Sequence, residues 1–223
     1  MKGMRQLGLT LCLLSVTAAS AKAQMGMGMR QAPMPRGIFN AVVGSGGEYE
    51  ITTADGHMTK IGYAIVGKET VNGKDAYWME WTTSGMGNGE MVMKVLIALD
   101  GSNTATSRVI MQMPGRPPME MPSQMNRMNS QAQSADIRTT ADDVGSESVT
   151  VPAGTFTCEH YRMKDGSGDT WVSSKVSPLG VVKHQGKDST MVLTKVITDA
   201  KDKIIGIPQM FNPAMMMQQP PQQ

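Results

Sequence analysis

The sequence predicts a mainly β protein, a curved antiparallel sheet with one or two short helices over its open face. Roughly seven to nine short runs rich in β-branched and aromatic residues alternate with Gly, Pro, Asp and Asn turn signals. In the clearest runs, apolar residues recur at every second position, which is the period of a strand. One run, Met91–Leu99, is apolar on both faces and is therefore expected to be covered on both.

Residues 1–23 have the pattern of a signal peptide. Lys2 and Arg5 provide the positive start, Leu7–Val16 is the short apolar stretch, and Ala21-Lys22-Ala23 is a cleavage site of small residues. We therefore expect cleavage after Ala23 and a periplasmic or secreted protein without a transmembrane segment.

Cleavage changes the cysteine and charge counts. Cys12 lies inside the apolar stretch and not at the cleavage point, which argues against a lipid anchor, and Cys158 then remains without a partner for an internal disulfide. Removing Lys2, Arg5 and Lys22 from the 21 basic residues leaves 18, against 19 acidic residues. This near-neutral balance gives no support for a nucleic-acid partner.

The mature chain divides by composition. Residues 24–46 are rich in Met, Gly and Pro and are expected to form a flexible arm. Residues 47–207 form a single β-rich domain, interrupted at 114–134 by a Pro- and Met-rich insertion. Residues 208–223, with their Gln, Pro and Met repeats, are expected to be a disordered tail.

In the first half of the domain, the predicted strands are Glu48–Thr53, Met58–Val71, Asp75–Thr83, Met91–Leu99 and Thr104–Met113. Asn72-Gly73 is the strongest hairpin signal, because a type I′ turn needs a positive φ at both central residues. Asp100-Gly101 predicts a second hairpin. On the strands beside Asn72-Gly73, alternation places Tyr63 between Ile61 and Ile65 on one face, and Trp81 in line with Met79.

The insertion begins as a Pro-rich loop. Met121, Met125, Met128 and Ala132 then recur at helical spacing, which predicts a short helix near Ser123–Gln133. Asp136–Val144 is either a second helical piece or a loop.

In the second half of the domain, turn signals separate Val149–Val151, Thr155–Met163, Asp169–Ser173, Gly180–His184 and Met191–Ile197. Lys201–Ile207 is expected to form a last strand.

This second half also carries a resemblance. The run Val-Pro-Ala-Gly-Thr-Phe-x-Cys (Val151–Cys158), the Trp-Val-Ser strand (Trp171–Ser173) and the Pro-Leu-Gly turn (Pro178–Gly180) resemble exported bacterial proteins of unknown function related to the lipoprotein-localisation-factor-like superfamily. That superfamily is a curved half-barrel with helices over its open face, and its best-known members carry lipid or lipoprotein acyl chains. The resemblance implies this fold but transfers no site residue, because the motif contains no catalytic signature.

The main functional hypothesis is a non-enzymatic module that binds or carries a lipid or another apolar ligand in the cell envelope, without a cofactor. Its candidate ligand-binding residues are Tyr63, Trp81, Met93, Ile97 and Trp171. Because burial of one methylene contributes about 0.8 kcal/mol, an acyl chain can bind without specific polar contacts. The alternative is a purely structural envelope protein in which side chains fill the same face.

A second alternative starts from the 23 methionines. Thioethers are soft ligands that suit Cu(I), and the candidate ligands are Met25, Met27, Met29, Met121, Met125 and Met128. The opposing interpretation is that methionine fills irregular apolar space. The oligomeric state is left open by the sequence.

Two other patterns bear on catalysis. Cys158 and His160 are two residues apart on one predicted strand, so they share a face, but Phe156 on that face favours a buried, inert cysteine. The glycines of Gly85–Gly89 join two strands and not a strand and a helix, so they predict a turn and not a phosphate site. We therefore expect no enzymatic activity.

Overall fold

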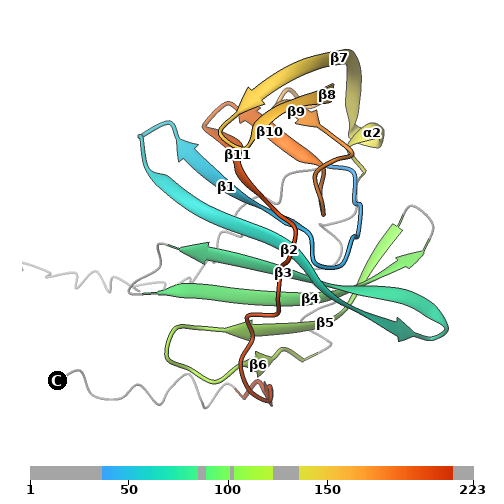
Figure 1. The fold of residues 1–223 in the computed structure, drawn as a ribbon, viewed down its shortest axis with the longest axis vertical. Helices are drawn as coiled ribbons and strands as arrows, with labels where there is room; N and C mark the ends of the chain where they lie inside the picture. The colour runs from blue at the N-terminus through green and yellow to red at the C-terminus, as the bar shows by residue number, and fades with distance from the viewer. Residues whose placement is uncertain (1–36, 85–88, 101–102, 123–135, 213–223) are drawn as a thin grey trace, which may run out of the picture. The chain divides into compact units, whose positions relative to one another are not determined.

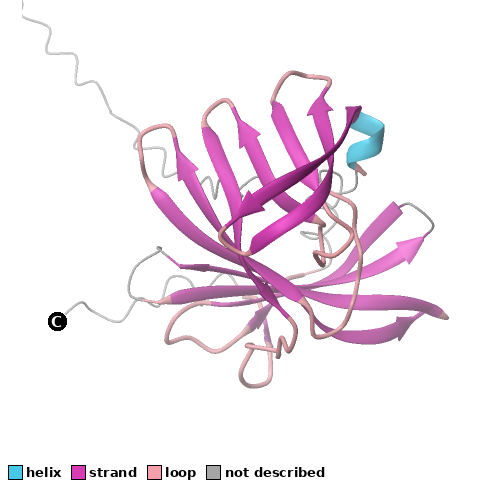
Figure 2. Cartoon of the chain, turned by 45° about the horizontal axis from the view of Figure 1, so that its top comes forward, coloured by secondary structure: helices cyan, strands magenta, loops and turns pink. Residues whose placement is uncertain are grey.

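The computed structural model describes residues 37–84, 89–100, 103–122 and 136–212, and these residues form an open, curved sheet (Figure 1). The strands are β1 (Gly46–Thr53), β2 (Met58–Val71), β3 (Lys74–Ser84), β4 (Glu90–Asp100), β5 (Asn103–Gln112), β6 (Met119–Glu120), β7 (Ala141–Val151), β8 (Gly154–Met163), β9 (Gly168–Val172), β10 (Val181–Gly186), β11 (Ser189–Ile197) and β12 (Gln209–Met210). Figure 2 shows that strands dominate the described residues, beside one short helix, α2 (Ile137–Thr140). The predicted mainly β class is confirmed.

The sheet has 12 strands in the order β12-β6-β5-β4-β3-β2-β1-β11-β10-β9-β8-β7. It consists of two antiparallel meanders, β1 to β6 and β7 to β11, which the pairing of β1 with β11 joins. The short β12 runs parallel to β6. Within the described residues, no helix has the length and apolar character needed to cross a membrane.

The sheet presents two different faces in the first meander. Tyr63, Trp81 and Met93 are register partners on β2, β3 and β4, and we call their side the Tyr63 face. Ala64, Glu80 and Lys94 are register partners on the opposite side, the Glu80 face. Because side chains alternate along a strand, these rows define the two faces as far as the register shifts, which lie between Ile65 and Gly67 in the β2–β3 pair and between Leu96 and Ile97 in the β4–β5 pair.

The hairpin between β2 and β3 has the predicted turn. Asn72 has φ 51° and Gly73 has φ 76°, so both central residues are left-handed, as a type I′ turn requires. The turn fixes the pairing of Val71 with Lys74, and the register of the hairpin follows from it.

Both faces of the first meander are covered by other parts of the chain, as the two-faced apolar strand Met91–Leu99 predicts. On the Tyr63 face, Ile65, Met79, Val95 and Ile97 form a buried cluster beneath Phe39 and Ala41. On the Glu80 face, Ala76, Trp78, Leu96 and Ile110 form a second cluster, against which Ile204 packs.

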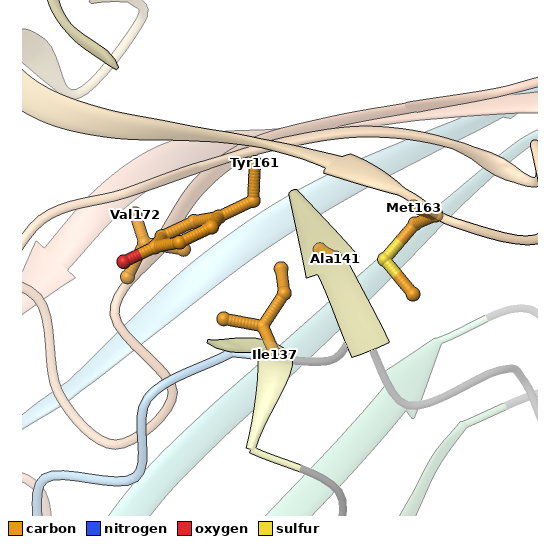
Figure 3. Close-up of a cluster of buried hydrophobic side chains, with 5 residues drawn as sticks. All are labelled: Ile137, Ala141, Tyr161, Met163 and Val172. Atoms are coloured by element: carbon orange, nitrogen blue, oxygen red, sulfur yellow. The ribbon is translucent and has the colours of Figure 1, made fainter. Parts of the chain in front are cut away.

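The second meander has its own core (Figure 3). Tyr161 and Met163 of β8 pack with Val172 of β9, and Ile137 of α2 and Ala141 of β7 complete the cluster. Ile137 is fully buried, so α2 contributes one side chain to the core at this end of the sheet.

Residues 37–45, which fall in the predicted flexible arm, pack as part of the domain. The Ile38 N–H donates to the Leu179 carbonyl (3.0 Å) and the Asn40 N–H to the Pro178 carbonyl (2.7 Å). Further along, the Gly44 N–H donates to the Ile65 carbonyl (2.7 Å). These backbone partners lie far away in sequence, so composition alone did not reveal them.

The predicted strand at Lys201–Ile207 is wrong. This segment crosses the sheet as an irregular strap, because side chains bind its backbone N–H groups: Glu80 accepts from Lys203, Asp202 from Ile204 and Gln112 from Ile205. We call residues 200–207 the C-terminal strap.

Other boundaries also differ. β6 lies within the predicted insertion and β12 within the predicted tail. The Asp136–Val144 piece is divided between α2 and the start of β7, and Asp136 caps α2 by accepting the Arg138 N–H (3.0 Å). The helix predicted near Ser123–Gln133 and the turn glycines at 85–88 lie outside the described residues.

Candidate functional site

The structure brings together four of the five predicted ligand-binding residues. Tyr63, Trp81 and Met93 are direct neighbours across three strands, and Ile97 belongs to the buried cluster of the same face. Trp171 does not join them. Its register partners across the neighbouring strands are Lys183, Val192 and Glu50 in turn. Glu50 leads through Lys60 to Ser84, which lies on the Glu80 face, so Trp171 points to the side of the sheet opposite to Tyr63.

Trp171 belongs to a polar cluster on the second meander. Its ring stacks on His160 with 4.5 Å between ring centroids, and the Lys183 ammonium lies 4.7 Å from its centroid. Glu147 accepts a hydrogen bond from the Trp171 indole (2.5 Å) and pairs with His160 Nδ1 (3.2 Å). This ring is occupied by the protein's own groups and does not line an apolar surface.

The Tyr63 face is covered unevenly. Tyr63 (2% exposed) and Ile97 (6% exposed) are buried, and Phe39 and Ala41 lie over the Ile97 end. Trp81 and Met93 are only half-buried. The Ile97 end is thus core, whereas the Trp81 end retains accessible apolar side chains.

Trp81 also has an unusual donor. Its Nε1 atom is buried and has no hydrogen-bond partner among the described residues. Leaving such a donor unpaired costs about 1–3 kcal/mol. Trp78, by contrast, donates its indole N–H to Glu69 (2.6 Å), so the unpaired state is specific to Trp81.

A row of methionines extends from Trp81 across the next three strands on the same face. Met93 of β4 is opposite Met111 of β5, which is opposite Met119 of β6, and Met91 follows on β4 at the next position of this face. We call Trp81, Met91, Met93, Met111 and Met119 the Trp81–methionine surface. Sequence reasoning missed Met111 and Met119 as members, because the Pro-rich composition around the two-residue β6 predicts a loop and hides its pairing with β5.

The methionines predicted as metal ligands are a different set. Met25, Met27, Met29, Met125 and Met128 lie outside the described residues. Met121 is described, half-buried, and its N–H donates to the Val109 carbonyl (2.8 Å) just after β6. In the described ranges, no group of three or more His, Cys, Asp or Glu side chains is placed to hold a metal ion.

The Glu80 face contains a polar groove that the sequence did not predict. It has a volume of about 650 Å³ and lies between β1, β2, β3, β11 and the C-terminal strap. Acidic and basic side chains line it together, and two of the pairs neutralise each other: Glu48 with Lys195 (3.4 Å) and Glu90 with Lys203 (3.0 Å). This internal pairing leaves no excess of one charge to select a ligand class.

Glu80 is the unusual group of this groove. It is 2% exposed, and burial raises the pKa of its carboxyl to about 7, although the Lys203 N–H at 2.9 Å opposes the shift. The nearby Asp202 carboxylate adds to the rise in this pKa, and Lys94 opposes it. Glu80 therefore changes charge near neutral pH while it holds the strap.

Cys158 and His160 share a face, as predicted, but do not form an activated pair. Cys158 is 1% exposed, and burial together with the Glu147 carboxylate raises the pKa of its thiol to about 11. His160 is held by Glu147 and by Asp169, whose Oδ1 is 2.7 Å from Nε2. A thiol with a raised pKa is a poor nucleophile at neutral pH.

No protein-family model matches the chain, and no curated protein matches it. Among solved structures, a provisionally named lipoprotein from Parabacteroides distasonis ATCC 8503 is 15% identical, over 72% of this chain and 98% of its own, with a TM-score of 0.36. A provisionally named exported protein with a YmcC-like fold from Bacteroides fragilis NCTC 9343 is 14% identical, over 73% and 99%, with a TM-score of 0.36. A likeness at this level transfers no function, and the resemblance to the lipoprotein-localisation-factor-like superfamily stays an expectation.

Proposed function

We propose that this chain is an exported, non-enzymatic binding module that takes an apolar ligand of the lipid class on the Trp81–methionine surface. The observation that carries the proposal is the half-buried indole of Trp81, whose N–H has no partner among the described residues. A donor of this kind inside an apolar surface suits a ligand that brings both hydrocarbon and an oxygen acceptor.

The chemistry of the surface supports this ligand class. Met91 and Met93 are half-buried thioether side chains beside Trp81, and methionine adapts its shape to an irregular apolar partner. Each methylene that a ligand buries there contributes about 0.8 kcal/mol. A carboxyl or ester oxygen at the Trp81 N–H adds about 0.5–1.5 kcal/mol and relieves an unpaired donor.

The cover of the Ile97 end limits the size of the site. Phe39 and Ala41 occupy that end, so the ligand contacts the surface from Trp81 towards Met91 and does not extend over Ile97. In the purely structural alternative, no ligand occupies the Trp81 end or any other part of this face.

The proposal is tested by organic extraction of the purified full-length chain, followed by mass spectrometry. We expect a co-purifying amphiphile with an acyl chain from the wild-type protein and from the W171F variant, whose substitution lies on the opposite face. The W81F variant keeps an aromatic ring but loses the N–H, so its affinity for a fatty acid should fall roughly two- to twelvefold. Absence of any lipid in the extract, together with equal affinities of W81F and W171F, would support the structural alternative.

Export is a separate part of the proposal and has its own test. Cleavage after Ala23 gives a mature protein that begins at Gln24. N-terminal sequencing of the protein from the envelope or medium fraction should therefore read Gln-Met-Gly, and an intact Met1 in the cytoplasm contradicts export.

A further inference from the structure

We propose that Met93, Met111 and Met119 form a binding site for a soft monovalent cation, Cu(I) or its analogue Ag(I), beside the ring of Trp81. The three residues lie on β4, β5 and β6, and each is the direct register partner of the next. Trp81 on β3 is the register partner of Met93, so the row continues into an aromatic ring.

The strand geometry lets the three sulfurs reach one ion. Register partners of an antiparallel sheet point to the same side, and neighbouring strands are about 4.8 Å apart. An ion above the central Met111 is therefore one strand spacing from the strand of Met93 and one from the strand of Met119. A thioether lies on a flexible side chain of two methylenes, so the outer sulfurs can lean towards the centre.

The ligand chemistry selects the ion. Thioethers are soft and neutral, and they suit Cu(I), whereas carboxylates and imidazoles suit harder ions. In the parts of the chain that the structure describes, no three His, Cys, Asp or Glu side chains group to offer a competing site. Met111 (9% exposed) and Met119 (7% exposed) are buried, and an uncharged ligand set in such a place favours a single positive charge over two.

Trp81 contributes in a second way. The face of an indole ring attracts a cation, and this attraction increases where water is excluded. Its register position next to Met93 brings the ring to the edge of the proposed site. Met93 is half-buried, which gives the ion a route from solvent.

This row differs from the methionine clusters that the sequence alone suggested. Met25, Met27, Met29, Met125 and Met128 lie outside the described residues. In the row, the sheet has already fixed the backbone of Met93, Met111 and Met119. Ligands whose backbone is already fixed avoid the entropy cost of ordering when the metal binds, and this preorganisation favours tight binding.

The metal site shares Met93, Met111 and Met119 with the proposed lipid surface, but the two proposals have separate readouts on the wild-type protein: lipid extraction for one and Cu(I) competition for the other. Leucine has nearly the volume and apolar character of methionine but lacks the sulfur. The M93L/M111L/M119L variant should therefore stay folded while it loses the metal, and the presence of a lipid is read from the extract of the wild-type protein. Failure of one proposal is then visible without failure of the other.

The experiment is an anaerobic competition titration of the purified full-length chain against a chromophoric Cu(I) chelator. Two control variants replace three methionines elsewhere: M58L/M163L/M191L, which changes one exposed residue and two buried residues away from the row, and M25L/M27L/M29L. We expect one Cu(I) per chain for the wild type and both controls, and an affinity lowered by about a hundredfold or more in M93L/M111L/M119L. X-ray absorption of the Cu(I) protein should show a first shell of sulfur.

The proposal is overturned if the row variant binds as tightly as M58L/M163L/M191L, or if the wild type binds no Cu(I) in competition. Loss of binding in M25L/M27L/M29L alone also overturns it, because the ligands then lie on the arm. Circular dichroism and thermal unfolding of each variant establish that all are folded. Titration with Ag(I) in a W78F/W171F background adds a direct readout, in which Trp81 emission must change in step with binding.

Discussion

Two segments cross the first meander on opposite faces, and the sheet holds them by different forces. The N-terminal segment, residues 37–45, covers the Tyr63 face with Phe39 and Ala41 and hydrogen-bonds through its backbone. The C-terminal strap covers the Glu80 face with Ile204 as an apolar contact and is otherwise anchored by polar side chains. Both faces of these strands thus carry a buried apolar cluster, but the N-terminal segment is held mainly by apolar packing and backbone hydrogen bonds, whereas the strap is held mainly by polar and charged side chains.

The charges of the strap are only partly shielded. The Lys94 side chain is 10% exposed and pairs with Asp202, which is 42% exposed. The Lys94 ammonium also lies 4.8 Å from the centroid of the Trp78 ring. If Asp202 is lost, the Lys94 ammonium therefore still has the Trp78 ring as a partner and is not an isolated buried charge.

The largest loss of stability should come from a substitution beneath the N-terminal segment. Ile65 is fully buried beneath the N-terminal segment, and Ile65→Ala should lower the free energy of unfolding by about 2–5 kcal/mol through lost burial and the cavity it leaves. Ile204→Ala, a matched change at a half-buried position of the strap, should cost clearly less. Urea denaturation of both variants measures the difference, and equal losses would contradict the contrast between core and attachment.

The next effect is a pH dependence centred on Glu80. Because burial raises its folded pKa from 4.5 to about 7, the folded state holds a proton that the unfolded state has released between these values. The stability that Glu80 contributes is therefore greatest below about pH 4.5 and is lost as the pH rises through about 7. Over this window the loss is on the order of 3 kcal/mol.

Glu80→Gln removes this titration while it keeps an oxygen acceptor for the Lys203 N–H. The variant should gain stability relative to the wild type above neutral pH, and its unfolding free energy should vary less between about pH 5 and about pH 8. Denaturation curves at both ends of this range make the measurement. If the unfolding free energies of the wild type and of E80Q change equally with pH over this range, Glu80 does not titrate in this way.

The smallest effect concerns the ion pair of the strap. Asp202→Asn should change global stability by less than about 1 kcal/mol, because one partner is substantially exposed. It should nevertheless speed hydrogen exchange of the Lys203 and Ile205 amides, which bond to Glu80 and Gln112. The control is Asp75→Asn, which removes the exposed Lys68–Asp75 pair (2.8 Å) and should leave strap exchange unchanged. Unchanged exchange in both variants would mean that charge does not hold the strap.

The turns and the two faces of single strands could be predicted from sequence, because they depend on residues close together in the chain. Asn72-Gly73 specifies its own turn, and the alternation of Ile61, Tyr63 and Ile65 specifies a face. The two covering segments could not be predicted. Ile38 meets Leu179, and Lys203 meets Glu80, across more than a hundred residues, and neither pairing has a local signal.

The candidate site shows the same division. Tyr63, Trp81 and Met93 could be selected from aromatic and apolar alternation, whereas the pairing of Met111 with Met119 depended on β6, two residues in a Pro-rich stretch. Residue type alone groups Trp171 with them, but the register places it on the other face. Glu80 resembled an ordinary surface residue of an alternating strand, because the strap that buries it comes from the end of the domain.

The central claim is that the ligand contacts Trp81 on the Tyr63 face, and two single-tryptophan proteins test it most directly. W78F/W171F keeps only Trp81, and W78F/W81F keeps only Trp171. A fatty acid with a brominated acyl chain quenches tryptophan emission on contact, and we predict saturable quenching of Trp81 with little effect on Trp171. Saturable quenching of Trp171 alone, or none in either protein, would contradict the claim.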